Sequence, residues 1–361
     1  MINPQMLTLL RESRGLSGAK LAELSQIPQP TLSKMENGLA PLDPARLMQI
    51  AEVLDYPIEA FAWTDPVYGF GHAAFYHRKQ QALPQTTLRK IQANVNLTRI
   101  RLERLLRSIV VDAEYPVPVL DGVEFGGPAG AARAVRAQWR IPMGPIEDMM
   151  AVIERAGIIV VRTSLESPKI SAISIDAIGT YPPLILLNTG MSADRERFTL
   201  AHELAHLVLH SAVAAPDEAE DEANSFASEF LMPAAEIRVQ LKGITLERAA
   251  QLKRVWKVAM SAIIRRARDL GTIDETRYRS LNVSISQKGW RKVEPVEIPR
   301  DEPSIVTALV DVHLREHGYT VEELAQVVAL SSAEFGARFD VAPLPPKREV
   351  GASRSHLRAV L

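Results

Sequence analysis

Histidines recur every fourth residue in the segment TLAHELAHLVLH, which spans residues 199–210. If this segment is helical, His202, His206 and His210 share one face, and Glu203 follows the first of them. Side chains four residues apart on a helix are neighbours, so the imidazoles of His202 and His206 can converge on one metal ion. The spacing therefore predicts a helix that carries part of a metal site.

The sequence contains no cysteine, which excludes disulfides, thiolate zinc ligands and cysteine nucleophiles. A Zn²⁺ ion would have to be held by histidine and carboxylate side chains. The order His-Glu-x-x-His, which His202 and His206 begin and end, is typical of zinc hydrolases. In such a site Glu203 is turned toward the water on the metal and can take its proton as the general base.

A catalytic zinc site usually has three protein ligands and one open position. His210 lies eight residues from His202, which is about 12 Å along a straight helix. No glycine lies between His206 and His210 to break the helix. We therefore interpret His210 as a structural residue or as a partner of a ligand.

The segment EAEDEAN, residues 218–224, offers the missing ligand. Glu220 and Asn224 are four residues apart on a helix expected over 217–231. We choose Glu220 as the third ligand and Asn224 as a partner that orients the site without touching the metal. Glu222 is the alternative ligand, since only one of the two glutamates should face the metal. A solvated helix start, favoured by the helix dipole, explains the same acidic residues without a metal.

Residues 4–64 predict several short helices, and two of them are joined by a tight turn. Ser17 can cap the first of the pair, and the second begins near residues 28–29 and ends by Gly38. Such a pair inside a small bundle is typical of a helix-turn-helix module, whose second helix enters the major groove of DNA. The side chains that this helix would present to bases and phosphates are Gln29, Thr31, Ser33 and Lys34.

The charge of this module does not by itself favour DNA, because residues 1–60 hold five Lys and Arg against seven Asp and Glu. Phosphate attraction supplies much of the affinity of DNA-binding proteins. A helical bundle used for protein contacts is therefore the alternative. An amphipathic helix expected over 86–110 could supply positive charge, since residues 77–107 hold eight Lys and Arg against Glu103 alone. A solvated helix face explains that charge equally well.

The segment RGLSGAKLAELSQIPQPTLSKMENG carries the layout of the first module, and through it residues 4–61 resemble the Cro-type, or XRE, helix-turn-helix family. The resemblance implies binding to a double-stranded DNA operator, and we expect a homodimer because such modules read palindromes. One departure is Gly18, where the family usually carries a glutamine that touches phosphate.

The segments RFTLAHELAHLVLH and EAEDEANSFASEFLMP, with the patterns around them, resemble the ImmA/IrrE family of metallopeptidases over about 130–282. The resemblance implies a zinc-dependent endopeptidase that cuts a specific regulatory protein, often a repressor. It places the zinc ligands on His202, His206 and Glu220, and the general base on Glu203.

Apolar patterns and Pro- and Gly-rich boundaries divide the chain into five parts. They are a helix-turn-helix domain (1–64), a linker with a basic amphipathic helix (65–127), a metallopeptidase domain (128–285), a small helical unit (286–342) and a basic, disordered tail (343–361). The expected fold class is multidomain and mainly α. It combines an all-α helix-turn-helix bundle, an α+β zincin-like metallopeptidase domain with a small sheet, and a helical C-terminal region.

Three buried strands are expected in the metallopeptidase domain, at 157–163, 170–179 and 182–188. The middle strand departs from the ImmA/IrrE pattern, since Ile173-Ser174-Ile175 stands where the family often has Asp-Ala-Phe. We expect this strand to line the substrate cleft, so the departure leaves the substrate preference open.

These features predict a DNA-binding transcription regulator with a zinc endopeptidase domain that acts on a regulatory or partner protein, such as a repressor or a toxin. Two alternatives stay open: an antitoxin that represses its own operon, and a regulator whose peptidase fold only senses a ligand or binds a partner. No apolar run is long enough for a membrane helix and no signal segment precedes the first helix, so we expect a cytoplasmic protein. Residues 319–339 again show helix-turn-helix spacing, for which we favour a helical cap or a dimer contact over a second DNA reader.

Overall fold

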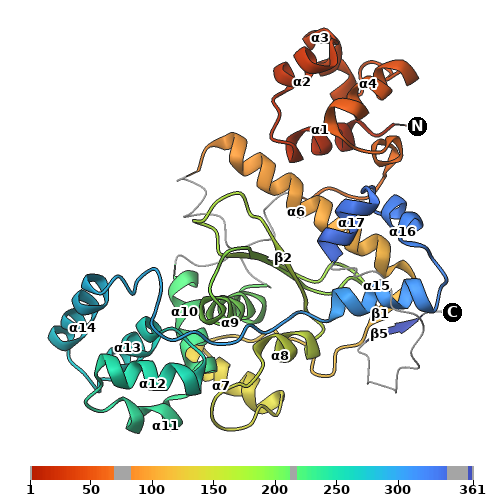
Figure 1. Ribbon diagram of the computed structural model, residues 1–361. Coiled ribbons are helices and arrows are strands. Elements are labelled where there is room, and N and C mark those ends of the chain that lie inside the picture. Colours follow the sequence, from red (N-terminus) through yellow and green to blue (C-terminus); the bar gives the residue numbers. More distant parts are fainter. Residues whose placement is uncertain (1, 69–82, 212–217, 340–356, 360–361) are drawn as a thin grey trace.

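The structure, a computed structural model, describes residues 2–68, 83–211, 218–339 and 357–359. A small helical bundle forms the N-terminal end, and a larger part, in which helices surround a sheet, lies beneath it (Figure 1). The long helix α6 (Gln85–Leu105) runs between the two. The expected fold class, mainly α with an N-terminal helical bundle and a small sheet, is confirmed.

Short helices with tight connections form the N-terminal bundle. They are α1 (Pro4–Ser13), α2 (Gly18–Ser25), α3 (Gln29–Glu36), α4 (Pro44–Leu54) and the 3-10 helix η1 (Ile58–Ala62). Side chains of Asn3, Ser17 and Asp43 accept backbone N–H groups at the starts of α1, α2 and α4, which satisfies donors that a helix leaves unpaired. Between α2 and α3 the chain turns through Gln26 in the left-handed region, with φ 57°.

A three-stranded sheet lies at the centre of the larger part. It consists of β2 (Ile159–Thr163), β3 (Ala172–Ile175) and β4 (Leu184–Asn188). The order is β2-β4-β3, with β2 parallel and β3 antiparallel to β4. Successive side chains of a strand point to opposite faces, so Ile185 and Leu187 enter one hydrophobic core and Leu184 and Leu186 the other. Both faces are buried, which explains why these strands are almost continuously apolar.

The first face of the sheet shares a hydrophobic core with the helices that follow the linker. They are α7 (Pro128–Gln138), α8 (Met149–Arg155), α9 (Ala193–Leu209), α10 (Ala219–Leu231), α11 (Ala234–Ile237), the 3-10 helix η4 (Arg238–Leu241), α12 (Leu246–Trp256), α13 (Met260–Asp269) and α14 (Glu275–Gln287). Their buried side chains share one hydrophobic core with the sheet. This core supports α9, which carries the histidines.

The second face of the sheet is covered by α6 and by three helices near the C-terminus. These are α15 (Ile305–Arg315), α16 (Val321–Val327) and α17 (Ser332–Phe339). Phe335 and Phe339 of α17 are buried in the core beneath this face. The apolar residues of the C-terminal segment with helix-turn-helix spacing therefore pack into the core that the second face of the sheet shares.

The helix expected over 86–110 ends earlier than its apolar pattern suggests. After Leu105 the chain forms a 3-10 turn, η3 (Leu106–Ser108), and then the strand β1 (Ile109–Val111). The β-branched residues of β1 favour a strand over a helix. β1 pairs with β5 (Leu357–Ala359), the one described segment of the tail that we expected to be disordered; the rest of that tail lies outside the described residues.

Two arginines of α6, Arg99 and Arg101, are buried and cannot supply charge for DNA, whereas Arg89 on the same helix is exposed. Arg101 is buried and its Nε donates to the carbonyl of Val328 at 3.0 Å. Burial lowers the pKa of Arg101 to about 10. Arg99 is buried and pairs with Glu103. Among the described residues, part of the basic stripe read from the sequence is therefore a set of internal contacts, while Arg89 and Arg107 stay exposed.

Packing also makes α6 a shared element. Ala93, Leu97 and Ile100 belong to the core of the N-terminal bundle, whereas Leu88 and Leu102 belong to the core on the second face of the sheet. One helix thus connects both cores. No helix within the described ranges is both long and apolar enough to cross a bilayer.

Candidate metal centre

The histidines lie on α9 because the apolar residues of this helix bury its other side. Leu200, Leu204 and Val208 are four residues apart and are buried in the core on the first face of the sheet. The helix packs against both α10 and β3. Its polar face is therefore turned toward the start of α10, where the acidic residues lie.

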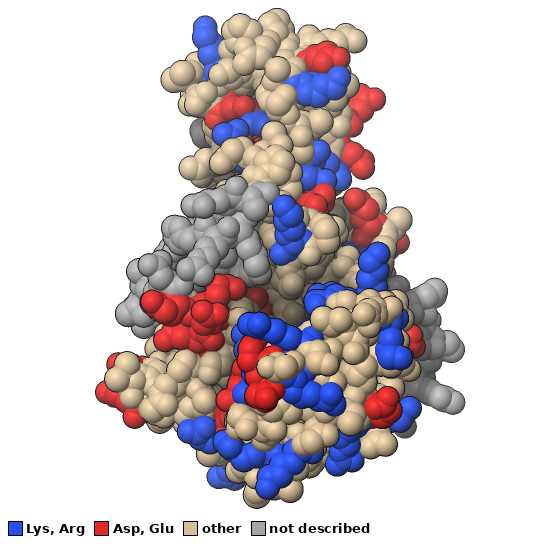
Figure 2. Space-filling model, turned by 90° about the vertical axis from the view of Figure 1, so that its left-hand side faces the viewer, with Lys and Arg blue, Asp and Glu red and all other residues tan. Residues whose placement is uncertain are grey.

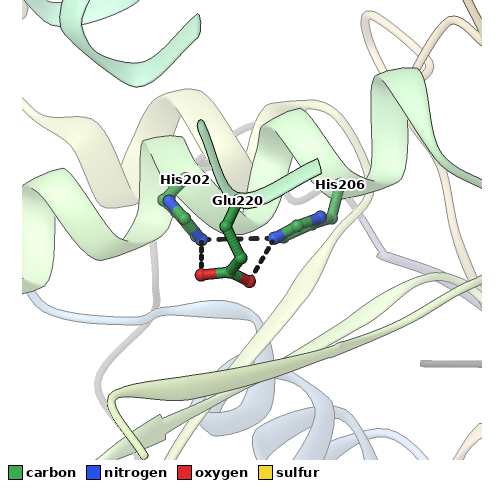
Figure 3. Close-up of side chains that lie close together, drawn as sticks. All are labelled: His202, His206 and Glu220. Atoms are coloured by element: carbon green, nitrogen blue, oxygen red, sulfur yellow. Dashed lines mark hydrogen bonds and ion pairs between the residues drawn. The ribbon is translucent and has the colours of Figure 1, made fainter. Parts of the chain in front are cut away.

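His202, His206 and Glu220 point toward one another from α9 and α10 (Figure 3). The Nε2 atoms of His202 and His206 are 3.2 Å apart. The carboxylate of Glu220 lies 3.8 Å from Nε2 of His202 and 3.6 Å from Nε2 of His206. The structure thus brings together the three residues that we selected as ligands.

The separation of these atoms suits a shared metal ion. Two ligand atoms that each lie about 2.0–2.1 Å from a zinc ion in tetrahedral geometry are roughly 3.3–3.4 Å apart. The three observed separations, 3.2, 3.6 and 3.8 Å, are close to this value. The side chain of Glu220 is 32% exposed, so the site is open to solvent on one side. Two imidazoles and one carboxylate fit the donor set of a catalytic zinc site.

Glu203 follows His202 on α9, is 1% exposed as a residue, and directs its carboxylate to the sheet. The hydroxyl of Ser174 donates to Oε2 of Glu203 at 2.8 Å. Ser174 lies on β3, two residues from Ala172, and therefore shares the sheet face that α9 covers. We did not identify Ser174 as a site residue from the sequence. Strand alternation could have placed it on this face, but nothing local indicated its partner.

His210 contacts His206 and is not part of the group formed by His202, His206 and Glu220. Its Nδ1 lies 2.9 Å from Nδ1 of His206, and its Nε2 lies 2.9 Å from Oε2 of Glu222. Burial lowers the pKa of His210, although the hydrogen bond with Glu222 raises it. The structure thus places Glu222, our alternative ligand, against His210 and places Glu220 against the other two histidines.

The side chain of Asn224 forms a hydrogen bond with the backbone of α10. Its Nδ2 donates to the carbonyl oxygen of Glu220 at 2.7 Å, one helical turn earlier. We expected this side chain to orient the site, and the contact that the structure gives it lies in the turn that carries Glu220.

The four predicted DNA contacts lie on α3. Gln29 and Lys34 are exposed, whereas Thr31 and Ser33 are half-buried. Leu32 and Met35, on the opposite side of this helix, are buried in the bundle core. This arrangement turns a polar helix face outward, as a recognition helix requires.

Charge is mixed around the N-terminal bundle. Figure 2 shows basic and acidic side chains near one another at the upper end, where the bundle lies, and more Lys and Arg at the opposite end. Within the bundle, Nε of Arg11 on α1 donates to Oε1 of Glu36 on α3 at 2.5 Å, so this cation fixes α3 in place. Base contacts, more than bulk charge, would have to carry recognition of DNA.

Two family models match this chain. Residues 7–61 match a helix-turn-helix family, and residues 153–268 match the family described as IrrE N-terminal-like domain, which is a peptidase family. The second match includes His202, Glu203, His206 and Glu220. Both resemblances seen in the sequence are therefore confirmed, in the same order along the chain. No curated protein matches the chain.

Proposed function

Because the chain joins a helix-turn-helix domain to an IrrE-like peptidase domain, we propose that it is a DNA-binding transcription regulator that carries a zinc-dependent endopeptidase. In this proposal His202, His206 and Glu220 hold Zn²⁺ and Glu203 is the general base. The convergence of two imidazoles and one carboxylate, with Glu203 following His202 on the same helix, is the observation that supports it most strongly.

The chemistry follows from the residues around that point. A bound zinc ion would supply Lewis acidity, which polarises a peptide carbonyl and makes water more acidic. Glu203 accepts the proton of the attacking water as its oxygen bonds to the carbonyl carbon, and passes that proton to the leaving amine as the C–N bond breaks. Ser174 holds the carboxylate of Glu203 through Oε2, which leaves Oε1 for the proton.

Zinc content and proteolysis test this proposal together. Glu220→Gln should abolish zinc binding, because it removes an anionic ligand. Glu203→Gln should keep zinc and lose cleavage by at least about 100-fold, the usual size of general-base catalysis. Glu218→Gln makes the same chemical change at an exposed residue and should alter neither property.

The substrate can be sought with the same variants. Proteomes of cells that carry the wild type and cells that carry Glu203→Gln should differ in a regulatory protein that persists only with the variant. If every protein turns over alike in the two, or if Glu203→Gln cleaves as fast as the wild type, the peptidase proposal is wrong.

DNA recognition by α3 has a separate test. Gln29→Ala should cost about 1–3 kcal/mol against the best operator sequence and relax the preference at one base pair. Lys34→Ala should weaken binding to all sequences alike and reduce the salt dependence by about one phosphate contact. A homodimer should protect two half-sites about one helical turn apart. If both variants bind DNA as the wild type does, α3 is not the helix that recognises DNA.

A sensory role for the peptidase fold is the second candidate, and the packing of α6 favours it. This helix belongs both to the core of the N-terminal bundle and to the core on the second face of the sheet. A conformational change in the peptidase part that shifts α6 would therefore also shift the core of the N-terminal bundle, to which α3 belongs. In a pure sensor, zinc removal alters operator affinity, while Glu203→Gln regulates its genes as well as the wild type.

A further inference from the structure

A chain of hydrogen bonds leads from the metal position to a carboxylate that does not take part in it. Nδ1 of His206 lies 2.9 Å from Nδ1 of His210, and Nε2 of His210 lies 2.9 Å from Oε2 of Glu222. Both imidazoles are buried, whereas the side chain of Glu222 is 38% exposed. The chain thus begins near the surface and ends at Nε2 of His206.

The carboxylate fixes the direction of each bond in this chain. A carboxylate oxygen accepts a hydrogen bond, so Nε2 of His210 is the donor in its contact with Glu222. With its N–H at Nε2, His210 offers the lone pair of Nδ1, so the hydrogen bond between the two rings is donated by an N–H at Nδ1 of His206. Nε2 of His206 then keeps a free lone pair, and it is this atom that lies 3.2 Å from Nε2 of His202.

We propose that Glu222, acting through His210, holds His206 in the tautomer that can bind a metal ion and fixes the orientation of its ring. Glu222 and His210 are positioning residues, since the atoms that face the metal position belong to His202, His206 and Glu220. The inference rests on the proposed function, because it concerns the readiness of that same metal site.

This arrangement gives two neighbouring carboxylates of α10 different tasks. Glu220 faces the Nε2 atoms of the two ligand histidines, and Glu222, two residues later, faces His210. Successive positions on a helix diverge, so one helix start can reach both places. Loss of such an outer partner usually weakens metal affinity by roughly 10- to 100-fold, because the ligand loses its orientation and part of its basicity.

The tautomers can be read in the metal-free protein from long-range ¹H–¹⁵N correlation spectra after labelling with ¹⁵N-histidine. We expect the ring proton on Nε2 in His210 and on Nδ1 in His206. The signals are assigned by their disappearance in His210→Gln and His206→Gln. A proton on Nδ1 of His210 would overturn the proposal.

Zinc affinity, measured by competition with a chelator, gives the second readout. Glu222→Ala should bind zinc roughly 10- to 100-fold more weakly than the wild type. Glu222→Gln keeps an oxygen that can accept from His210 and should restore part of the affinity. Asp221→Ala is the matched control, since it removes the same charge from an exposed neighbour on the same turn. Equal effects of Glu222→Ala and Asp221→Ala would contradict the inference.

Failure of the proposed function would look different. A wild type that binds no zinc, yet shows the expected tautomers, refutes the metallopeptidase and leaves the role of Glu222 in orienting His206 intact. A wild type that binds zinc at His202, His206 and Glu220, with no loss in Glu222→Ala, keeps the metallopeptidase and refutes this inference.

Discussion

At the scale of single residues, the carboxylate of Glu203 is held by the hydroxyl of Ser174. Glu203 is almost completely buried, and its carboxylate accepts from Ser174 on the neighbouring strand. Removing the donor of a buried acceptor destabilises the fold, because the acceptor has lost its water and has no hydrogen bond in its place. Ser174 therefore contributes to stability as well as to the position of the proposed general base.

We predict that Ser174→Ala lowers the free energy of unfolding by about 1–3 kcal/mol, because the carboxylate of Glu203 is left without this donor. Urea unfolding of the zinc-free protein measures the change. Ser280→Ala, at an exposed position of α14, should stay within about 0.5 kcal/mol of the wild type. Equal free energies of unfolding of the two variants would show that the hydroxyl of Ser174 does not stabilise the fold.

Helix spacing indicated His202 and His206 as proposed ligands, and the spacing of Glu220 and Asn224 together with the ImmA/IrrE resemblance favoured Glu220 over Glu222. The roles of Glu222 and Ser174 could not be predicted in this way. Glu222 contacts a residue on another helix, and Ser174 contacts one 29 positions along the chain. Such contacts depend on how α9 packs against α10 and β3, which no local pattern encodes.

At the scale of elements, α15 is attached to the end of α6 by a histidine. Nε2 of His313 donates to the carbonyl of Leu105 at 2.7 Å, and Nδ1 of His317 lies 3.3 Å from Nδ1 of His313. Burial lowers the pKa of His313 below its ordinary value of 6.5, although the bond to Leu105 raises it. The folded protein therefore prefers this imidazole to be neutral.

Stability should therefore fall as the pH drops below about 6.5, since the unfolded chain takes up a proton there that the folded chain resists. One such group accounts for at most about 1.4 kcal/mol per pH unit. We predict that His313→Gln, which can still donate to Leu105, loses less stability between pH 7.5 and 5.5 than the wild type. Urea unfolding at both pH values checks this, and identical losses would contradict it.

Element boundaries followed the sequence where caps and turns are local, as at Ser17 and Gln26 in the N-terminal bundle. They failed at the end of α6, where the apolar period continues into β1. The strand forms there because β5 pairs with it, and β5 lies almost 250 residues later. A strand partner so far away in the sequence cannot be predicted from the local pattern of apolar residues.

At the scale of the whole molecule, α6 joins the DNA-reading bundle to the sheet. Leu97 is fully buried in the core of the bundle, while residues on the other side of α6 enter the core beneath the sheet. The two parts should therefore unfold together. The sequence could not indicate this, because Arg99 and Arg101, which looked like part of a basic surface, are turned inward by the packing of α6.

We predict that Leu97→Ala costs about 2–5 kcal/mol, the usual range for a buried leucine, and shifts a single calorimetric transition to lower temperature. Leu39→Ala, at a side chain that is 77% exposed, should leave the transition unchanged. If Leu97→Ala instead splits the transition in two, the bundle unfolds on its own and α6 does not couple the parts.

Anomalous diffraction at the zinc edge from zinc-loaded crystals tests the central claim most directly. We predict one strong peak bounded by Nε2 of His202, Nε2 of His206 and a carboxylate oxygen of Glu220, each at about 2.0–2.2 Å. Glu222 should lie outside the coordination sphere, next to His210. A peak coordinated by Glu222, or no peak between α9 and α10, would contradict the account.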